Sequence, residues 1–193
     1  DPRLRLTLRP GMNTAYLAFN TRKPPLDRPE VRQALALGIN NERLMELIFY
    51  GTAETAASIL PRASWAYDTD ARITPYNPQK AREELKALGI ENLHLNLWVP
   101  SASQAWNPSP MKTAELLQAD LAQIGVRVTI VQVDGRFQEA RLMEMNHDLT
   151  LTGWSTDSND PDSFFRPLLS CAAIASQTNY AHWCNPEFDD LVH

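Results

Sequence analysis

The sequence predicts an α/β domain whose core sheet is largely parallel. Between residues 93 and 152, segments with the alternating apolar pattern of a strand and segments with the spacing of an amphipathic helix follow each other as strand, helix, strand, helix, strand. Short connections between such segments are typical of βαβ units with right-handed crossovers. The length of 193 residues is sufficient for a substantial hydrophobic core.

The composition is that of an ordinary globular protein. Hydrophobic residues make up 44% of the chain and charged residues 21%, which argues against intrinsic disorder. The formal net charge of −5 argues against a nucleic-acid partner, which usually meets a basic excess. No apolar run reaches the roughly 18 residues that a membrane-spanning helix needs.

The N-terminal part is predicted to contain two strands and a helix. Residues 4–8 and 14–19 show the period-two alternation of strands. Asp27 and Glu30 have the spacing of a capping box, so we expect a helix that starts there and continues to about Ile39.

Two further helices are predicted on either side of a long loop. The first covers 42–50 and ends at Gly51, a residue type common at helix ends. Residues 52–76 show no long periodic segment and are expected to form an ordered surface loop. Asn77–Pro78 then starts a helix that ends at Gly89, because proline is well suited to the first helical position.

The central elements are the most regular. Strands are predicted over 93–99, 126–131 and 149–152, and helices over 110–124 and 134–146. Residues 187–191 read as the first turn of a helix, which is unstable alone, so we expect the chain to be a piece of a longer protein.

Two cysteines lie close together near the C-terminal end. A bridge between Cys171 and Cys184 would contribute about 3 kcal/mol in the chain-entropy model and would place the protein outside the cytosol. Free thiols are one alternative. A metal site with His182 is another, although it would have only three ligands and no closely spaced cysteine pair.

The predicted topology points to two loops as the ligand-binding region. In open α/β sheets, ligands bind beyond the carboxyl ends of the parallel strands. The loop after the first core strand contains Trp106, and the loop after the third contains Trp154 and Asp157. Aromatic walls suit a small-ligand site, and a carboxylate can pair with a ligand ammonium group. The alternative is that both tryptophans are ordinary core residues.

Other interpretations of the acidic loop are weaker. A calcium loop that starts at Asp157 would have Pro161 and Asp162 where an oxygen ligand and glycine are needed, so a metal is not expected. Asp157 and Asp160 could form the carboxylate pair of a secreted hydrolase. Asp160 could instead cap a helix that begins near Pro161. The sequence contains no signature of a serine hydrolase, a zinc protease or a nucleotide-binding loop, so we predict neither an enzyme nor a cofactor.

An ordered set of motifs along the whole chain resembles the extracytoplasmic solute-binding proteins of peptide ABC transporters. The motifs are Leu17–Thr21, Pro25–Asp27, Val31–Leu35, Asn77–Pro78, Asn107–Pro108, Gly153–Trp154 with Asp157 and Asp160–Pro161, and Glu187–Leu191.

The resemblance implies a two-lobed protein that encloses its ligand by hinge closure. Residues 1–193 would then form a single α/β lobe, without the other lobe and the C-terminal return segment. It further implies a cofactor-free monomer in the periplasm of a Gram-negative bacterium. This protein would capture peptides, including cationic or antimicrobial ones, or other amine-bearing ligands for an inner-membrane ABC permease.

The resemblance also assigns roles to individual residues. Asp157 would bind the α-ammonium group of the peptide, and Cys171–Cys184 would form a disulfide. Gln104 stands where dipeptide-binding relatives carry an arginine for the ligand carboxylate, and a neutral amide cannot replace a bidentate guanidinium. Strict dipeptide binding is therefore not expected. The predicted cleft-lining residues are Gly153, Trp154, Ser155, Gln104 and Trp106.

Overall fold

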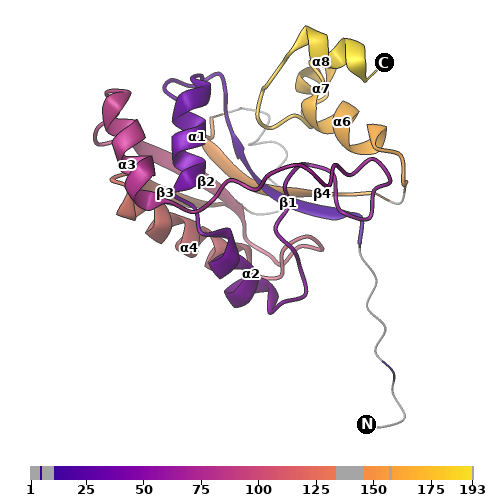
Figure 1. Cartoon of the computed structure of the whole chain (residues 1–193), viewed down its shortest axis with the longest axis horizontal. Helices are drawn as coiled ribbons and strands as arrows, with labels where there is room; N and C mark the ends of the chain where they lie inside the picture. Colours follow the sequence, from indigo (N-terminus) through magenta and orange to yellow (C-terminus); the bar gives the residue numbers. More distant parts are fainter. Residues whose placement is uncertain (1–4, 6–10, 134–145, 157, 193) are drawn as a thin grey trace.

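A computed structural model describes residue 5 and residues 11–133, 146–156 and 158–192 (Figure 1). The predicted strand over 4–8 and the predicted helix over 134–146 lie outside the described residues, apart from Arg5 and Asn146.

The structure has a four-stranded sheet in the order β1-β4-β2-β3. Strand β2 (His94–Pro100) runs parallel to both β3 (Arg127–Val133) and β4 (Leu149–Ser155). Strand β1 (Asn13–Phe19) pairs with β4 in the antiparallel direction. The prediction of a largely parallel sheet is therefore confirmed, and the antiparallel edge strand is an addition to it.

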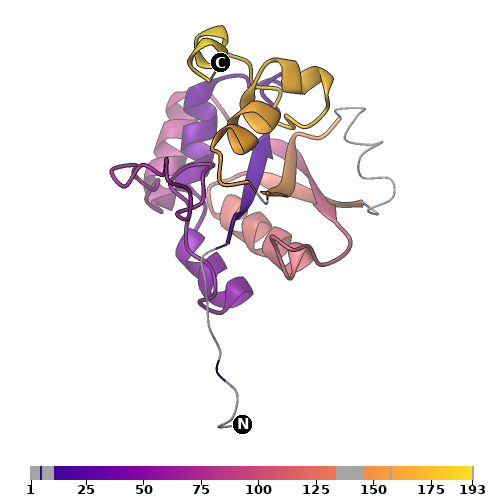
Figure 2. The same ribbon diagram turned by 90° about the vertical axis from the view of Figure 1, so that its right-hand side faces the viewer.

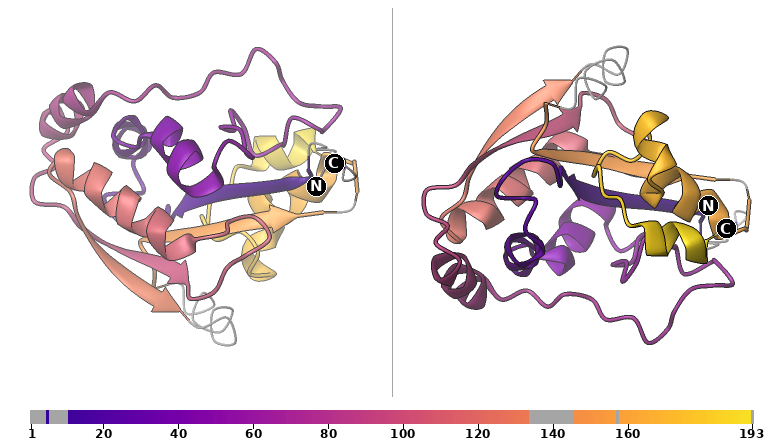
Figure 3. Two further views of the ribbon diagram at one scale, coloured as in Figure 1. Left: turned by 90° about the horizontal axis from the view of Figure 1, so that it is seen from below. Right: turned by 90° about the horizontal axis from the view of Figure 1, so that it is seen from above.

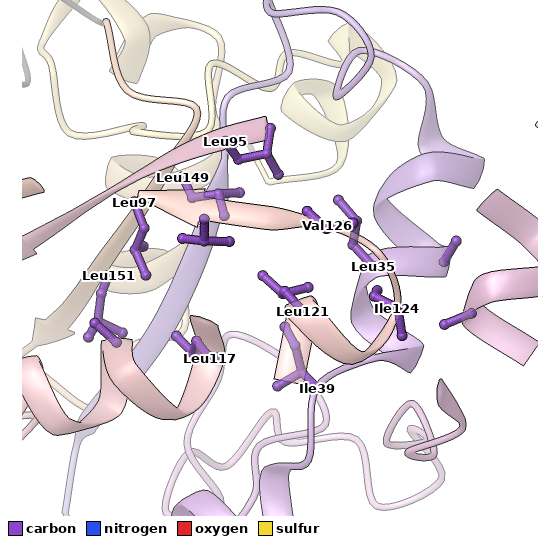
Figure 4. Close-up of a cluster of buried hydrophobic side chains, with 14 of the residues drawn as sticks. Leu35, Ile39, Leu95, Leu97, Leu117, Leu121, Ile124, Val126, Leu149 and Leu151 are labelled. Carbon is purple, nitrogen blue, oxygen red and sulfur yellow. The ribbon is translucent and has the colours of Figure 1, made fainter. Parts of the chain in front are cut away.

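Four helices cover one face of the sheet and enclose the main core. They are α1 (Pro29–Leu37), α2 (Asn41–Phe49), α3 (Pro78–Ala87) and α4 (Pro110–Gln123). Figure 4 shows the centre of this core, where leucines of β2 and β4 face Leu117 and Leu121 of α4. All four helices were predicted, because their apolar residues recur at helical spacing.

Prolines mark the starts of three of these helices. Pro29, Pro78 and Pro110 each occupy the first turn of a helix, where a missing N–H costs nothing. The expected capping box at Asp27 is wrong: the N-cap of α1 is Arg28, and its side chain makes no capping hydrogen bond. The proline fixes the start of the helix, which leaves Asp27 one residue too early to cap it.

Residues 52–76 contain no helix or strand, as expected. Figure 3 shows this loop as it arches across the molecule between α2 and α3. No helix in the part of the chain that the structure describes combines the length and apolarity needed to cross a membrane.

Three short helices gather at the C-terminal end, seen in orange to yellow in Figure 2. They are α6 (Asp162–Leu169), α7 (Ala172–Ala175) and α8 (Pro186–Leu191). The disulfide Cys171–Cys184, with an S–S distance of 2.02 Å, joins the start of α7 to the segment before α8. The predicted bridge and the predicted helix at 187–191 are both confirmed. A helix at the position of α6 was raised only as the alternative role of Asp160, and α7 was not predicted.

Candidate functional site

The parallel pairing of β2 and β4 brings two chain segments to the same edge of the sheet. The loop after β2 contains Gln104 and Trp106, and β4 ends at Gly153, Trp154 and Ser155. This is the edge at which the sequence predicted a ligand site.

Trp106 and Gly153 are in direct contact. A Cβ atom built on Gly153 would lie 2.2 Å from Cγ of Trp106, far inside van der Waals contact. The indole therefore rests on the backbone of β4, and only glycine allows this approach. Half-buried Trp106 also packs against the main core.

A short, well-bonded turn holds Trp106 in place. The N–H of Gln104 donates to the carbonyl oxygen of Asn107 at 2.8 Å, and the N–H of Asn107 donates back to Gln104 at 3.1 Å. Asn107 is buried, and its Nδ2 donates to Oγ1 of Thr113 at 2.9 Å while its Oδ1 accepts from the N–H of Ser109. Asn107 thus fixes the loop to the start of α4.

The residues predicted from the sequence to form the site did not include Asn107, which positions the loop. A signal was present, because an asparagine three residues before a helix start can accept from the backbone N–H two residues ahead of it. The hydrogen bond from Asn107 to Thr113 depends on how α4 packs against this loop, and the sequence does not show that packing.

The structure does not bring the two tryptophans together. Successive residues of a strand point to opposite faces, so Trp154 lies on the face opposite the one where Trp106 meets Gly153. Trp154 packs beside Phe164, and its Nε1–H donates to the carbonyl oxygen of Ser163 at 2.8 Å. Its indole N–H is thus already used within the fold.

The acidic segment after β4 is described only in part. Asp157 lies outside the described residues. Oδ1 of Asp160 accepts from the N–H of Asp162 at 3.0 Å, and its carbonyl oxygen accepts from the hydroxyl of Ser163. Asp160 therefore stabilises the first turn of α6, as its alternative interpretation expected.

Two other polar residues of the predicted site, Ser155 and Gln104, are exposed or make only a long hydrogen bond. Ser155 is exposed at the end of β4, next to its strand partner Asn13. Nε2 of Gln104 donates to the carbonyl oxygen of Ala102 at 3.3 Å. No group of three potential metal ligands exists among the residues that the structure describes, and the disulfide uses both cysteines of the suggested metal site.

One titratable group lies just behind Trp154. Tyr16 of β1 belongs to the same apolar cluster, and burial, followed by the charge of Tyr180, raises its pKa. The phenol therefore stays neutral at physiological pH and provides an apolar backing for the indole.

Comparison with known proteins agrees with the resemblance seen in the motifs. Residues 1–176 match the model of the bacterial extracellular solute-binding proteins, family 5 Middle. The chain is 81% identical over 192 residues to the peptide transport periplasmic protein SapA of Salmonella typhimurium, and 35% identical over 193 residues to the dipeptide-binding protein of Escherichia coli. These matches cover the whole chain but only 35% and 36% of the two relatives.

Solved structures give the same result. The dipeptide-binding protein of Pseudoalteromonas sp. SM9913, in complex with Met-Leu, superposes with a TM-score of 0.91 at 43% identity. The superposition covers 95% of this chain and 36% of that one. The chain therefore belongs to family 5 of the bacterial extracellular solute-binding proteins.

Proposed function

We propose that this chain is one lobe of a two-lobed periplasmic protein that captures peptides and delivers them to an inner-membrane ABC permease. The observation that carries the proposal is the contact between Trp106 and Gly153. It locks the loop after β2 onto the end of β4, so that both segments present one preformed wall. A preformed wall lowers the entropy cost of ordering a ligand.

The relatives support peptides as the ligand class. The Salmonella protein is named for peptide transport, and the Pseudoalteromonas structure holds the dipeptide Met-Leu. The family consists of solute-binding proteins, and the comparisons lend no support to the hydrolase alternative.

In this proposal, Asp157 anchors the amino group of the ligand. It follows Gly153 by four residues in the sequence, and a carboxylate forms a charge-assisted hydrogen bond with an ammonium group. Gln104 carries no charge, so the ligand carboxylate has no guanidinium partner at that position. This combination favours longer or cationic peptides over dipeptides.

Trp106, Gly153 and Ser155 would line the wall, and Trp154 would support it from the other face of the sheet. The remaining wall would come from a second lobe, since this chain spans about a third of the length of its relatives. A formed disulfide fits an oxidising compartment such as the periplasm. We propose that the whole protein acts as a monomer without a cofactor.

Calorimetry on the whole binding protein tests the anchor. The probes are the tripeptide Ala-Lys-Ala with a free amino terminus and its N-acetylated form. Asp157→Asn should weaken binding of the free peptide by about 10- to 100-fold, the range of a charge-assisted hydrogen bond. It should leave the weaker binding of the acetylated peptide nearly unchanged.

Asp160→Asn is the matched control, because an amide oxygen can still accept from the N–H of Asp162. Equal losses in both variants would show a general charge effect and would contradict the anchor. Mass spectrometry of the recovered peptide separates the alternatives: cleavage by the wild type that Asp157→Asn abolishes would favour a hydrolase.

Gly153→Ala tests the wall itself. The added Cβ forces the Trp106 indole away, so peptide affinity should fall while circular dichroism stays unchanged. A variant that binds peptide as tightly as the wild type would remove this contact from the site.

A further inference from the structure

A cavity of about 620 Å³ lies at the end of the strands opposite the Trp106–Gly153 contact. Residues that follow the end of β1, the start of α1 and the disulfide form its walls. In the β1–β4 pairing, the pair Asn13 and Ser155 lies at the end of the sheet where the peptide site is proposed. The pair Phe19 and Leu149 lies at the opposite end, near the cavity. A seven-residue strand separates these ends by about 20 Å.

The cavity contains a buried polar side chain without a partner. His182 is 6% exposed and lines the cavity, and neither Nδ1 nor Nε2 has a hydrogen-bond partner within the described part of the chain. Buried polar atoms are nearly always hydrogen-bonded, because burial removes them from water and an unmet hydrogen bond is destabilising. The ring is therefore ready to donate to a ligand.

The position and charge state of His182 suit a donor. Burial, with smaller contributions from the charges of Arg22 and His147, lowers its pKa to about 4, so the neutral ring keeps one N–H at pH 7. The His147 ring lies 6.5 Å away, centroid to centroid, and is held by a 2.8 Å hydrogen bond between its Nε2 and the carbonyl oxygen of Tyr180.

Two guanidinium groups line the same cavity, against one carboxylate. Arg22 makes no side-chain hydrogen bond or ion pair with any residue that the structure describes. Arg32 is oriented by Nη1, which donates to the carbonyl oxygens of Leu26 and Asp27 at 2.8 and 3.1 Å. The carboxylate is that of Asp27, which is exposed. The lining therefore favours an anion.

The rest of the lining is apolar except for Thr21, whose hydroxyl donates to the carbonyl oxygen of Ala181 at 3.0 Å. Ile174, Ala175, Pro29, Trp183 and the Cys171–Cys184 bridge contribute the apolar part. The volume lies within the range of small-molecule sites and far exceeds what an inorganic ion fills.

We propose that this cavity binds a small organic carboxylate with an apolar body, held by Arg22, Arg32 and His182. The guanidinium groups form charge-assisted hydrogen bonds with the carboxylate, His182 donates its ring N–H, and Ile174 and Trp183 cover the apolar body. The site is separate from the proposed peptide wall and does not depend on it.

The test uses the whole binding protein with phenylacetate, and phenylacetamide as the neutral control of the same shape. We expect phenylacetate to bind and the amide to bind at least tenfold more weakly. The imidazole ¹⁵N NMR signal of His182 is identified as the one that is missing from the spectrum of His182→Gln. Addition of phenylacetate should shift this signal in the wild-type protein. Absence of phenylacetate binding, or equal binding of the amide, overturns the proposal.

Charge variants locate the site. Arg22→Gln should weaken phenylacetate binding about tenfold. Asp27→Asn should strengthen it about two- to threefold, because a repulsive charge is removed. Arg28→Gln is the control, since Arg28 donates to the carbonyl oxygen of Leu88 and does not line the cavity.

A cavity that does not hold the carboxylate between these charges would not produce opposite effects in Arg22→Gln and Asp27→Asn. Unchanged affinity in Arg22→Gln overturns the proposal. Inorganic phosphate that displaces phenylacetate with equal affinity also overturns it, because the apolar wall would then contribute nothing.

Discussion

The two faces of the sheet are stabilised in different ways. The face under α1–α4 rests on one continuous aliphatic core, which includes Leu35, Leu97 and Leu121. The face under α6–α8 has a much smaller apolar cluster, in which Leu60, Phe164 and Leu168 are buried.

Other interactions supplement the smaller cluster. The disulfide joins Cys171 to Cys184, and the carboxylate of Asp189 accepts from the N–H of Cys171 at 3.1 Å. Phe188 contacts the rings of Phe165 and Trp183 edge-on. The comparison shows that α6–α8, whose apolar cluster is small, depend on a disulfide and a backbone-to-carboxylate hydrogen bond. The helices α1–α4 depend mainly on apolar burial, with an ion pair between Arg43 and buried Asp120 in addition.

The largest expected effect is in the main core. Leu121 is fully buried, so Leu121→Ala should lower the free energy of unfolding by about 3–5 kcal/mol, as transfer and cavity terms add. Urea unfolding of the whole protein measures this. Leu47→Ala is the control: Leu47 is 48% exposed, and a change within about 0.5 kcal/mol is expected. A similar loss of unfolding free energy in Leu47→Ala would contradict the assignment of Leu121 to a core that stabilises the fold by burial.

Removal of the disulfide should destabilise only the face of the sheet under α6–α8. The bridge closes a separation of 13 residues, and the chain-entropy model assigns it about 3 kcal/mol. In the double variant Cys171→Ser, Cys184→Ser, hydrogen exchange should accelerate over 162–192 and remain slow in β2 and β3. Reduction of the wild type should reproduce this pattern. Uniform acceleration would show that the two faces unfold as one unit.

The smallest effect is a dependence on pH that originates beside the disulfide. His182 has a pKa of about 4 in the fold and 6.5 when unperturbed, and burial also lowers that of His147. Between these values the unfolded chain binds more protons, so stability is complete above pH 6.5 and falls towards pH 4.

We expect a loss of at most about 3 kcal/mol across that window, since the pKa of His182 falls from 6.5 to about 4 and one pKa unit corresponds to about 1.4 kcal/mol. Urea unfolding at a series of pH values measures it. His182→Gln should flatten the profile, and a profile as steep as that of the wild type would assign the dependence to other groups.

Most of the regular fold could be predicted from the sequence. Helices such as α4 carry long apolar periodicity, and a proline marks their first turn. By contrast, α6 is short and contains Pro167, and α7 has only four residues, so neither has a periodicity that can be recognised. The antiparallel direction of β1 could not be predicted either, because it depends on pairing with β4, which is far away in the sequence.

The sequence by itself determined the family and the chain order of the core strands and helices that the structure describes, because these depend on local patterns and ordered motifs. It favoured a bridge between the two cysteines, which the structure then showed. Only the tertiary structure decided that Trp106 lies on Gly153 while Trp154 belongs to the opposite face. It alone placed His182 beside Arg22 in a cavity. These contacts join residues far apart in the chain, and their geometry follows from how turns and helices pack.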